Sequence, residues 1–392
     1  MMDTPDTESG IADIVREAAS SAAMPLEIRG GGTRLSLGRP VQAARTLSLA
    51  SLDGVTLYEP GELTLVVQAG MTIKALDDLL ETENQQLTFE PADHRALLGS
   101  TGEPTIGGAC AVAASGPRRL RMGAARDAVL GVRYVNGQGE VLRAGGRVMK
   151  NVTGYDIPKL MCGAYGTLGV ITEVALKVMP KSDVVRTLAI PGLPDGKAID
   201  ALSTALAMPC DVSGAAHLPE TVSRELGFSD PVTLLRVEGF ETQATYRIEK
   251  LTDALSHFGP VVATDSDPWV AIRDAMMFAG DDRAVWRISM KATDAPLLVA
   301  ALRERVEIEA FYDWGGGLVW LACAEARDAS AGTIRQLLAG FGGHATLIRA
   351  SDAVRAAVPV FEPEPAPVAA LGAGLKARFD PSGILNPGRM RA

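Results

Sequence analysis

The sequence predicts an α+β protein of two or three parts, and three observations lead to this expectation. Its 392 residues are enough for two or three domains of ordinary size around a large core. Strand-like runs alternate with amphipathic helical segments in both halves of the chain. Glycine makes up 15 of the 71 residues from Gly99 to Gly169, against 41 of 392 overall. Core-forming residues lie between these glycines, so the stretch is folded, and its glycines indicate tight turns or a ligand close to the backbone.

The elements of the first half follow from their periodicity. Ile11, Ile14 and Val15 share one helical face, so residues 11–20 are expected to be helical. Thr72 is a suitable N-cap for a helix that extends to about Glu83. The turn sequence Asn-Gly-Gln-Gly at 136–139 predicts a hairpin. Strands are expected at residues 26–28, 46–49, 55–58, 63–68, 129–135, 140–143 and 167–178.

The second half has its own strands and helices, which predicts a separate α+β part. Before it, residues 180–194 contain Pro191 and several charges, and we expect a crossover or a boundary there. The acidic, proline-rich residues 361–367 are expected to form an exposed loop. The other predicted elements are strands at 232–237, 285–290 and 318–322, and helices at 242–258, 295–306, 331–339 and 368–378.

Charge and composition exclude several classes of function. The net charge of −9 argues against nucleic acid as the main partner, because phosphate binding needs a basic surface. The cysteines form no Cys-x-x-Cys pair, which excludes a zinc ribbon, a local iron–sulfur signature and a disulfide scaffold. The histidines are too far apart for a helical zinc motif, so no metal site is predicted and redox chemistry would need a borrowed cofactor. These residues are Cys110, Cys162, Cys210, Cys323, His94, His217, His257 and His344.

Nothing in the sequence predicts export or membrane insertion. Residues 1–10 are acidic and polar, unlike the start of a signal peptide. No apolar run approaches the roughly 18 residues that a transmembrane helix needs. We therefore expect a cytoplasmic protein with reduced thiols.

The first motif of chemical interest is the loop at residues 29–34, at the end of a predicted strand. Three successive glycines can expose consecutive backbone N–H groups as a nest for an anion, and a diphosphate would suit it. A plain flexible turn explains the same residues equally well. The loop residues are Arg29, Gly30, Gly31, Gly32, Thr33 and Arg34.

The second motif is the sequence Pro-Thr-Ile-Gly-Gly at residues 104–108. Thr105 can cap a helix whose first turn holds Gly107 and Gly108. Such a start would bring N–H groups and the positive end of the helix dipole close to a ligand. Close packing on a sheet accounts for the alanines that follow, but not for the paired glycines.

The third motif combines residues 150–156 with residues 163–172, where glycines precede a predicted strand. Backbone groups there could hydrogen-bond the edge of a planar ring, and a tight turn into a buried strand is the other interpretation. Asp127 and Asp156 could act as helix caps or surface ion-pair partners. The Gly-x-Gly-x-x-Ala sequence at 372–377 is set aside as a helix start, because too little chain follows for a βαβ unit.

Taken in order, these motifs resemble the FAD-binding fold of the p-cresol methylhydroxylase (PCMH) and vanillyl-alcohol oxidase superfamily. The ordered set is the glycine loop, the Thr-Ile-Gly-Gly helix start, the sequence GTLGVITE at 166–173 and the tail FDPSGILNPGR at 379–389. The resemblance covers nearly the whole chain. Within the superfamily, the E subunits of bacterial glycolate oxidases resemble this chain most at residues 117–119, 130–131, 149–156, 285–289 and 313–316.

This resemblance implies a fold and a set of cofactor contacts. The fold is α+β, with a two-subdomain PCMH-type FAD-binding domain at 1–182, an α+β cap domain at 183–360 and a C-terminal segment, 361–392, that returns to the FAD domain. The glycine loop and helix start would contact the diphosphate, and residues 169–171 would meet the isoalloxazine edge. The ribityl and adenine path would be lined by Ser115, Gly116, Gly123 and Asp127. The implied FAD-binding residues are Arg29, Gly30, Gly31, Gly32, Thr33, Arg34, Pro91, Thr105, Ile106, Gly107, Gly108, Ser115, Gly116, Gly123, Asp127, Gly169, Val170 and Ile171.

Two departures from the family pattern bear on the chemistry. Members that attach FAD covalently often carry a histidine in the glycine loop, and this chain has Thr33 and Arg34 there, which implies non-covalent FAD. Catalytic D-2-hydroxy-acid members carry clustered histidines in the cap, and this chain lacks such a cluster, so its catalytic residues stay unassigned. Arg287 could meet a substrate carboxylate, although a surface position on a strand is the more ordinary interpretation. The role of Trp314 is left open.

The resemblance also implies partners. Glycolate would be oxidised to glyoxylate within a hetero-complex that contains a larger D-type flavoprotein subunit and an iron–sulfur F-type subunit as electron acceptor. The complex would be cytoplasmic or peripheral to the inner face of the plasma membrane. Two alternatives remain open: a structural partner with a vestigial FAD site, and a stand-alone FAD-dependent enzyme, either a 2-hydroxy-acid dehydrogenase or a reductase of the enolpyruvyl-glucosamine type.

Overall fold

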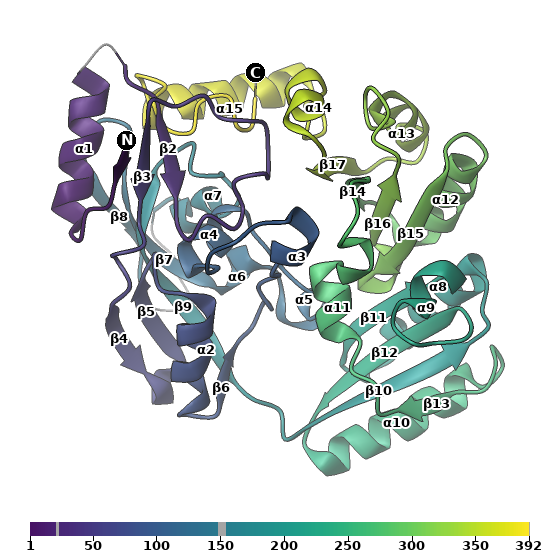
Figure 1. Ribbon diagram of the computed structural model, residues 1–392. Coiled ribbons are helices and arrows are strands. Elements are labelled where there is room, and N and C mark those ends of the chain that lie inside the picture. Colours follow the sequence, from purple (N-terminus) through teal and green to yellow (C-terminus); the bar gives the residue numbers. More distant parts are fainter. Residues whose placement is uncertain (21–22, 148–153, 392) are drawn as a thin grey trace.

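The computed structural model describes residues 1–20, 23–147 and 154–391, and it contains two bodies, each built on β-sheet (Figure 1). The first body comprises the chain up to Pro180 and the second comprises the chain from Val184 to Arg349. The residues that follow return to the first body, where the last helix lies above β2 and β3 (Figure 1). The candidate site therefore draws on both ends of the chain.

The first body contains two sheets. A parallel three-stranded sheet has the order β1-β3-β2, and a larger antiparallel sheet has the order β4-β5-β9-β7-β8, with β6 also paired to β9. The predicted hairpin is confirmed as β7 and β8. The strands are β1 (Met2–Asp3), β2 (Leu26–Arg29), β3 (Arg45–Ser48), β4 (Val55–Glu59), β5 (Thr64–Gln68), β6 (Gln85–Leu87), β7 (Val129–Val135), β8 (Val141–Gly145) and β9 (Val170–Pro180).

Short helices complete the first body. The predicted cap of α2 is confirmed, because the Thr72 side chain accepts a hydrogen bond from the Ala75 amide at 3.1 Å. Leu76 and Leu80 form the buried face of that helix. The helices are α1 (Glu8–Ser20), α2 (Ile73–Glu81), α3 (Arg95–Leu98), α4 (Ile106–Ala111), α5 (Arg119–Met122), α6 (Ala125–Ala128) and α7 (Ile157–Met161).

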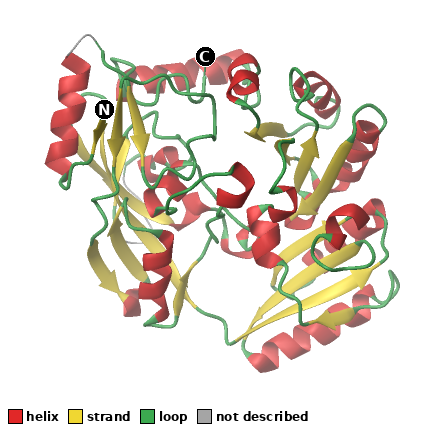
Figure 2. Ribbon diagram, in the orientation of Figure 1, coloured by secondary structure: helices red, strands yellow, loops and turns green. Residues whose placement is uncertain are grey.

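The second body is one eight-stranded sheet with helices packed on it (Figure 2). The order is β13-β10-β12-β11-β15-β16-β14-β17, and every pairing between neighbours is antiparallel. The strands are β10 (Val184–Pro191), β11 (Val212–Leu218), β12 (Val232–Gly239), β13 (Val262–Thr264), β14 (Ala284–Ser289), β15 (Ile308–Asp313), β16 (Leu318–Cys323) and β17 (His344–Arg349). The helices are α8 (Asp195–Ala207), α9 (Glu220–Arg224), α10 (Glu241–Leu255), α11 (Trp269–Asp274), α12 (Ala295–Arg303) and α13 (Ala331–Leu338).

Residues 180–194 were expected to hold a crossover or a boundary; the chain passes from the first body to the second between Pro180 and Val184, and strand β10 takes the place of a crossover. It is an inner strand, paired with β12 on one side and β13 on the other. Pro191 is compatible with this because it is the last residue of the strand. The charges lie at the start of the segment, and the residues from Thr187 to Ile190 are buried.

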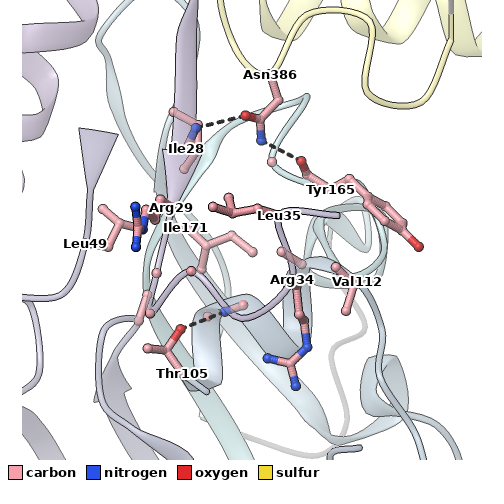
Figure 3. A pocket seen from close by; sticks show the side chains of 18 of the residues that line it. Ile28, Arg29, Arg34, Leu35, Leu49, Thr105, Val112, Tyr165, Ile171 and Asn386 are labelled. Atoms are coloured by element: carbon pink, nitrogen blue, oxygen red, sulfur yellow. Dashed lines mark hydrogen bonds between the residues drawn. The ribbon is translucent and has the colours of Figure 1, made fainter. Parts of the chain in front are cut away.

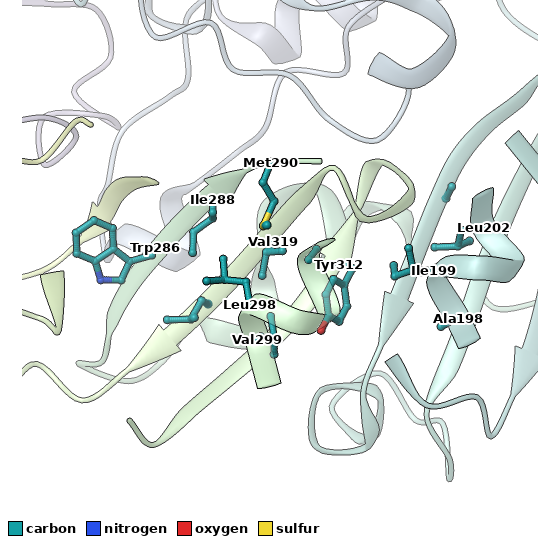
Figure 4. Packing of buried hydrophobic residues seen from close by; sticks show 14 of the residues in the cluster. Ala198, Ile199, Leu202, Trp286, Ile288, Met290, Leu298, Val299, Tyr312 and Val319 are labelled. Carbon is teal, nitrogen blue, oxygen red and sulfur yellow. The ribbon is translucent and has the colours of Figure 1, made fainter. Parts of the chain in front are cut away.

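Side chains of the large sheet alternate between two apolar layers. On the helix side, Trp286 and Ile288 of β14 pack with Leu298 and Val299 of α12 (Figure 4). Val285 belongs to the cluster on the opposite face, which also contains residues of the first body. Because strand side chains alternate between faces, Arg287 is directed to this second face, toward the first body.

A buried ion-pair cluster joins the two bodies. Glu90 of the first body accepts hydrogen bonds from both terminal nitrogens of Arg236 in β12, each at 2.9 Å. Arg118 of the first body donates to both carboxylate oxygens of Glu238 at 2.9 and 3.1 Å. All four side chains are mostly buried, so the sheet of the second body is held against the first by charge as well as by apolar contact.

The C-terminal segment contains α14 (Asp352–Ala357) and α15 (Ala366–Phe379). The loop predicted at 361–367 is observed at 361–365, and the helix that follows begins at Ala366, two residues before its predicted start. The Gly-x-Gly-x-x-Ala sequence lies within α15 rather than at its start, so the expectation of a helix start there is wrong. All four cysteines are buried and unpaired. None of the helices in the described ranges is long and apolar enough to cross a bilayer.

Candidate functional site

A cleft of about 710 Å³, open to solvent, lies where the glycine loop, α4, the turn before β9 and the C-terminal tail meet (Figure 3). The loop follows directly from β2, and β2 is fixed by parallel pairing to β3. The lining residues are Ile28, Arg29, Gly30, Gly31, Gly32, Thr33, Arg34, Leu35, Leu49, Ala69, Thr105, Gly107, Gly108, Ala111, Val112, Tyr165, Gly166, Gly169, Ile171, Asn386 and Arg389.

The glycine loop presents backbone N–H groups that the protein itself does not use. Within the described residues, the amides of Gly31, Gly32 and Thr33 donate to no acceptor. Arg34 follows them, and its Nε is buried without a hydrogen-bond partner, while its Nη2 donates to the Ala92 carbonyl at 2.7 Å. Burial lowers the pKa of Arg34 because desolvation disfavours the charged guanidinium. Free amides beside a buried cation form a site that suits a diphosphate.

Most glycines of the cleft are nevertheless required by close packing against backbone or side-chain atoms of the protein itself. A Cβ on Gly31 would lie 1.7 Å from the Glu103 carbonyl oxygen, and one on Gly30 would lie 2.3 Å from Thr105 Oγ1. A Cβ on Gly107 would lie 2.6 Å from that of Ala69. Close packing therefore explains Gly107, contrary to the expectation for the paired glycines. Gly108 is different, because a Cβ there would meet only Thr105 Oγ1 at 3.2 Å and Arg34 Nη1 at 3.7 Å.

Helix α4 does not supply the unused N–H groups expected of its first turn. The Ile106 amide donates to the Met71 carbonyl and the Gly107 amide to the Ala69 carbonyl, both at 2.9 Å. The Gly108 amide donates to Thr105 Oγ1 at 3.3 Å, as the predicted cap requires. The amides available to an anion therefore belong to the glycine loop, and α4 contributes its surface at Gly108.

The C-terminal tail closes the cleft through two side chains that the sequence did not single out. The Ile28 amide donates to Asn386 Oδ1, and Asn386 Nδ2 donates to the Tyr165 carbonyl, both at 2.8 Å (Figure 3). Arg389 Nη1 donates to the carbonyls of Leu35 and Leu37. Both residues belong to the Asn-Pro-Gly-Arg end of the tail motif, which the sequence did show. Spacing alone, however, could not predict that this end lies beside a loop some 350 residues earlier.

A second cavity, about 480 Å³ including its open mouth, adjoins the first and shares Val112 and Tyr165 with it. It lies between the first body and that face of β14, β16 and β17 which is directed toward the first body. Its lining residues are Leu37, Ala92, His94, Val112, Ala113, Ala114, Ser115, Gly116, Tyr165, Arg273, Arg287, Asp313, Leu318, Trp320 and Ile348.

Two polar side chains of this second cavity stand out. His94 is 8% exposed, and both of its ring nitrogens are buried without a hydrogen-bond partner in the described chain. Burial, with the nearby cations Arg34, Arg287 and Arg273, lowers its pKa to about 3, so the ring is neutral near pH 7. Burial lowers the pKa of Arg287 to about 10. Arg287 is partly buried and lines this cavity, so the prediction of a surface position for it is wrong.

Trp314 lies behind Arg287 at this cavity. Two guanidinium groups contact its ring, with Arg119 Cζ 4.3 Å and Arg287 Cζ 4.9 Å from a ring centroid. Its indole nitrogen donates to the Gly116 carbonyl at 3.1 Å. The neighbouring Asp313 accepts a hydrogen bond from the Trp314 amide at 2.7 Å, and burial raises the pKa of Asp313 to about 7.

The structure separates the predicted FAD-binding residues into three groups. Those in the first cleft are Arg29, Gly30, Gly31, Gly32, Thr33, Arg34, Thr105, Gly107, Gly108, Gly169 and Ile171. Those in the second cavity are Ser115 and Gly116. Those that line neither are Pro91, Ile106, Gly123, Asp127 and Val170.

Asp127 has a local structural role that explains its position. It accepts a hydrogen bond from the Ala124 amide at 2.8 Å at the start of α6, as the cap interpretation predicts. Asp156 likewise caps α7 through the Lys159 amide. Of the motif at 150–156, residues 150–153 lie outside the described residues. In the described ranges, no group of three potential metal ligands comes together.

Comparisons with known proteins agree with this geometry. Residues 1–145 match the sequence model of a family described as FAD binding domain. The chain is similar to glycolate oxidase subunit GlcE of Escherichia coli (strain K12), with 33% identity over 388 residues, which are 99% of this chain and 98% of that protein. It is also similar to glycolate oxidase subunit GlcD of Bacillus subtilis (strain 168), with 31% identity over 245 residues, 62% of this chain and 48% of GlcD.

Solved structures show the same fold at lower identity. p-Cresol methylhydroxylase with substrate bound has a TM-score of 0.73 and 15% identity, covering 99% of this chain and 88% of that chain. An alkyldihydroxyacetonephosphate synthase has a TM-score of 0.70 and 16% identity, covering 98% and 75%. The predicted α+β fold of the PCMH type is thereby confirmed.

Proposed function

Since this chain belongs to the family of FAD-binding glycolate oxidase E subunits, we propose that it is the FAD-binding subunit of a complex that oxidises glycolate to glyoxylate. In that reaction glycolate loses two electrons and two protons. FAD, when bound, supplies the two-electron acceptor. The residues of this chain bind and orient the cofactor and exclude water from it.

One observation carries the proposal, namely the glycine loop with its unused amides. The N–H groups of Gly31, Gly32 and Thr33 have no acceptor within the described chain, and the buried Arg34 Nε has no partner beside them. A buried guanidinium without an anion is costly, so the loop is complete only with a negatively charged ligand. We assign the diphosphate of FAD to this loop, and the ring edge to the region of Gly169 and Ile171.

We further propose that FAD is bound without a covalent bond. The loop has Thr33 and Arg34 where covalent members often have histidine, and the nearest histidine in the lining residues, His94, belongs to the second cavity. Precipitation of the purified chain with acid is expected to release all of its FAD into the supernatant. A yellow pellet would contradict the non-covalent site, and a chain that stays colourless after reconstitution with FAD would contradict the FAD site itself.

The electrons are proposed to leave through other subunits: a D-type flavoprotein and an iron–sulfur F-type protein. In support, the chain is similar to relatives named as subunits of glycolate oxidase. We place the complex in the cytoplasm, with any membrane contact made peripherally. Purification of the tagged chain from its own cells is expected to recover both partners, and recovery of the chain alone would favour a stand-alone enzyme.

The structural-partner alternative is tested by removing FAD from this chain only. We expect a complex whose E-type subunit carries Gly108→Val to lose glycolate oxidation together with one equivalent of flavin. Retained activity after that loss would mean that the FAD of this chain serves stability rather than electron transfer.

A further inference from the structure

We propose that the second cavity binds a small monocarboxylate with an oxygen on the adjacent carbon, such as a 2-hydroxy or 2-oxo acid. Arg287 would pair with the carboxylate and His94 would hydrogen-bond the adjacent oxygen. The choice of glycolate as the probe rests on the proposed function. The binding site itself rests on the cavity, and it would give this chain a substrate site of its own.

Arg287 has the environment of a group that awaits an anion. It lies between Trp286 and Ile288, whose side chains enter the opposite apolar layer, so the strand directs it to the cavity. Its guanidinium is stacked on Trp314, and in the described chain no carboxylate oxygen lies within 4.0 Å of it. A partly buried guanidinium without a counter-ion is unfavourable, and a bidentate carboxylate would satisfy it.

The other charged groups of the cavity limit the ligand to one negative charge. Arg273 is already paired with Asp274, at 2.7 Å for each of its two hydrogen bonds. Asp313 is the carboxyl group of this lining, and its burial favours the neutral form up to about pH 7. Arg287 is therefore left as the one lining arginine available to a ligand, which fits a monocarboxylate better than a dicarboxylate.

His94 supplies the second recognition element. Its ring packs edge-on against Trp320, with centroids 5.9 Å apart, and neither ring nitrogen has a partner in the described residues. Buried polar atoms of this kind are rare in native proteins unless a ligand or water satisfies them. A neutral imidazole offers one N–H donor and one nitrogen acceptor, so it can serve either a hydroxyl or a keto oxygen. With so low a pKa it acts here as a hydrogen-bonding group rather than as a proton carrier.

The remaining wall restricts the size of the ligand. The side chains of Ala92, Ala113, Leu318 and Ile348 are apolar, and the Ser115 hydroxyl is already engaged with the Ala113 carbonyl and the Ala125 amide. Two residues of this wall, Ala113 and Tyr165, have positive φ angles of 52° and 55°, as does Trp314 behind it, at 52°. Non-glycine residues in this region are strained and tend to gather at functional sites. Short aliphatic acids fit such a wall.

Isothermal titration of the full-length, FAD-loaded chain tests the proposal without measuring activity. The probes are glycolate, acetate, which lacks the second oxygen, and ethane-1,2-diol, which lacks the carboxylate. We expect glycolate to bind about 10-fold more tightly than acetate, and the diol not to bind. Arg287→Met keeps the contact with Trp314 and removes the charge, and it should lower the affinity for both acids about 10- to 100-fold. His94→Phe should lower the affinity for glycolate about 10-fold and change the affinity for acetate by no more than about twofold.

Control variants separate this result from misfolding. Arg186→Gln removes an exposed arginine that is paired with Glu241, and it should bind glycolate as the native chain does. Arg287→Lys keeps the charge without the planar fork and should give intermediate affinity. Each variant must match the native FAD content and thermal midpoint. Absent glycolate binding in a well-folded, FAD-loaded chain, or unchanged binding in Arg287→Met, overturns the proposal and leaves the proposed FAD function standing. A chain that binds glycolate but cannot be loaded with FAD overturns the proposed function instead.

Discussion

The carboxyl group of Asp313 shows how strongly a single buried residue can couple stability to pH. Burial raises its pKa to about 7 in the folded chain, against about 3.9 in an unfolded chain. Between these values the folded protein holds a proton that the unfolded protein releases. The free energy of unfolding therefore falls as pH rises from about 4 to 7, and the loss is complete above pH 7.

Asp313→Asn is expected to remove this penalty. The amide oxygen can still accept the hydrogen bond from the Trp314 amide, and no charge needs to be buried at pH 8. We expect an increase of about 1–3 kcal/mol in the free energy of unfolding at pH 8, with little change at pH 4.5. Urea denaturation at the two pH values measures the difference.

Asp78→Asn is the matched control, because Asp78 is exposed and pairs with Lys74. Its effect should stay below about 1 kcal/mol at both pH values. An Asp313→Asn variant that is destabilised equally at pH 4.5 and pH 8 would show that this carboxyl group is not held neutral by burial.

At the scale of single elements, the glycine loop and α4 can be told apart by two alanine substitutions. Gly31→Ala would drive a Cβ into the Glu103 carbonyl, whereas Gly108→Ala would meet only a hydroxyl and one guanidinium nitrogen, at 3.2 and 3.7 Å. Gly31→Ala should therefore lower both the thermal midpoint of the FAD-free chain and its affinity for FAD. Gly108→Ala should change that midpoint by no more than about 2 °C, the shift expected of about 0.5 kcal/mol in a chain of this size. It should nevertheless lower the affinity for FAD.

Fluorescence titration with FAD, combined with thermal unfolding of the FAD-free chain, distinguishes these outcomes. If Gly108→Ala binds FAD as the native chain does, the surface of α4 does not touch the cofactor. In that case the glycine loop alone would hold the diphosphate.

Elements with strong local signals were predictable, and the parts of the site that depend on distant contacts were not. The start of α2 could be predicted from Thr72, because the Thr72 side chain caps the first turn of its own helix. The position of the glycine loop was also evident from sequence. Its glycines could not be assigned to packing, because Gly31 needs the space beside Glu103, more than 70 residues later. His94 and Asn386 were missed for the same reason, since each acquires its role only when the sheets have been assembled.

At the scale of the whole molecule, the cluster around Glu90 holds the two bodies together. Burial alone would raise the pKa of Glu90, but Arg236 and Arg118 lower it below its ordinary value. A carboxylate with a lowered pKa contributes stability above the unfolded pKa of about 4.3, and this contribution is lost as pH falls below it. The joint should therefore weaken in acid.

Glu90→Gln is expected to cost about 3–5 kcal/mol at pH 7, because Arg236 would lose the closer of its two buried carboxylate partners, and Glu238 lies at 3.5 Å. The second body should then unfold separately from the first, which differential scanning calorimetry would record as two transitions instead of one. Glu220→Gln, which breaks an exposed pair with Arg224, should cost less than about 1 kcal/mol and keep the native profile. A single native-like transition in Glu90→Gln would mean that the pair of Glu90 with Arg236 is not needed to join the bodies, because Arg118–Glu238 and the apolar contacts remain.

The contacts of Asn386 and Arg389 with the glycine loop also set an order of events in time. The ribosome makes the loop long before the tail. The hydrogen bonds from the Ile28 amide to Asn386 and from Arg389 to the Leu35 carbonyl, on either side of the loop, span 358 and 354 positions. Contacts of such separation form late, because a long chain must first be brought together. A nascent chain therefore carries its phosphate-binding loop without the segment that braces it. We expect cofactor capture to be one of the last steps of folding, after the sheets have formed.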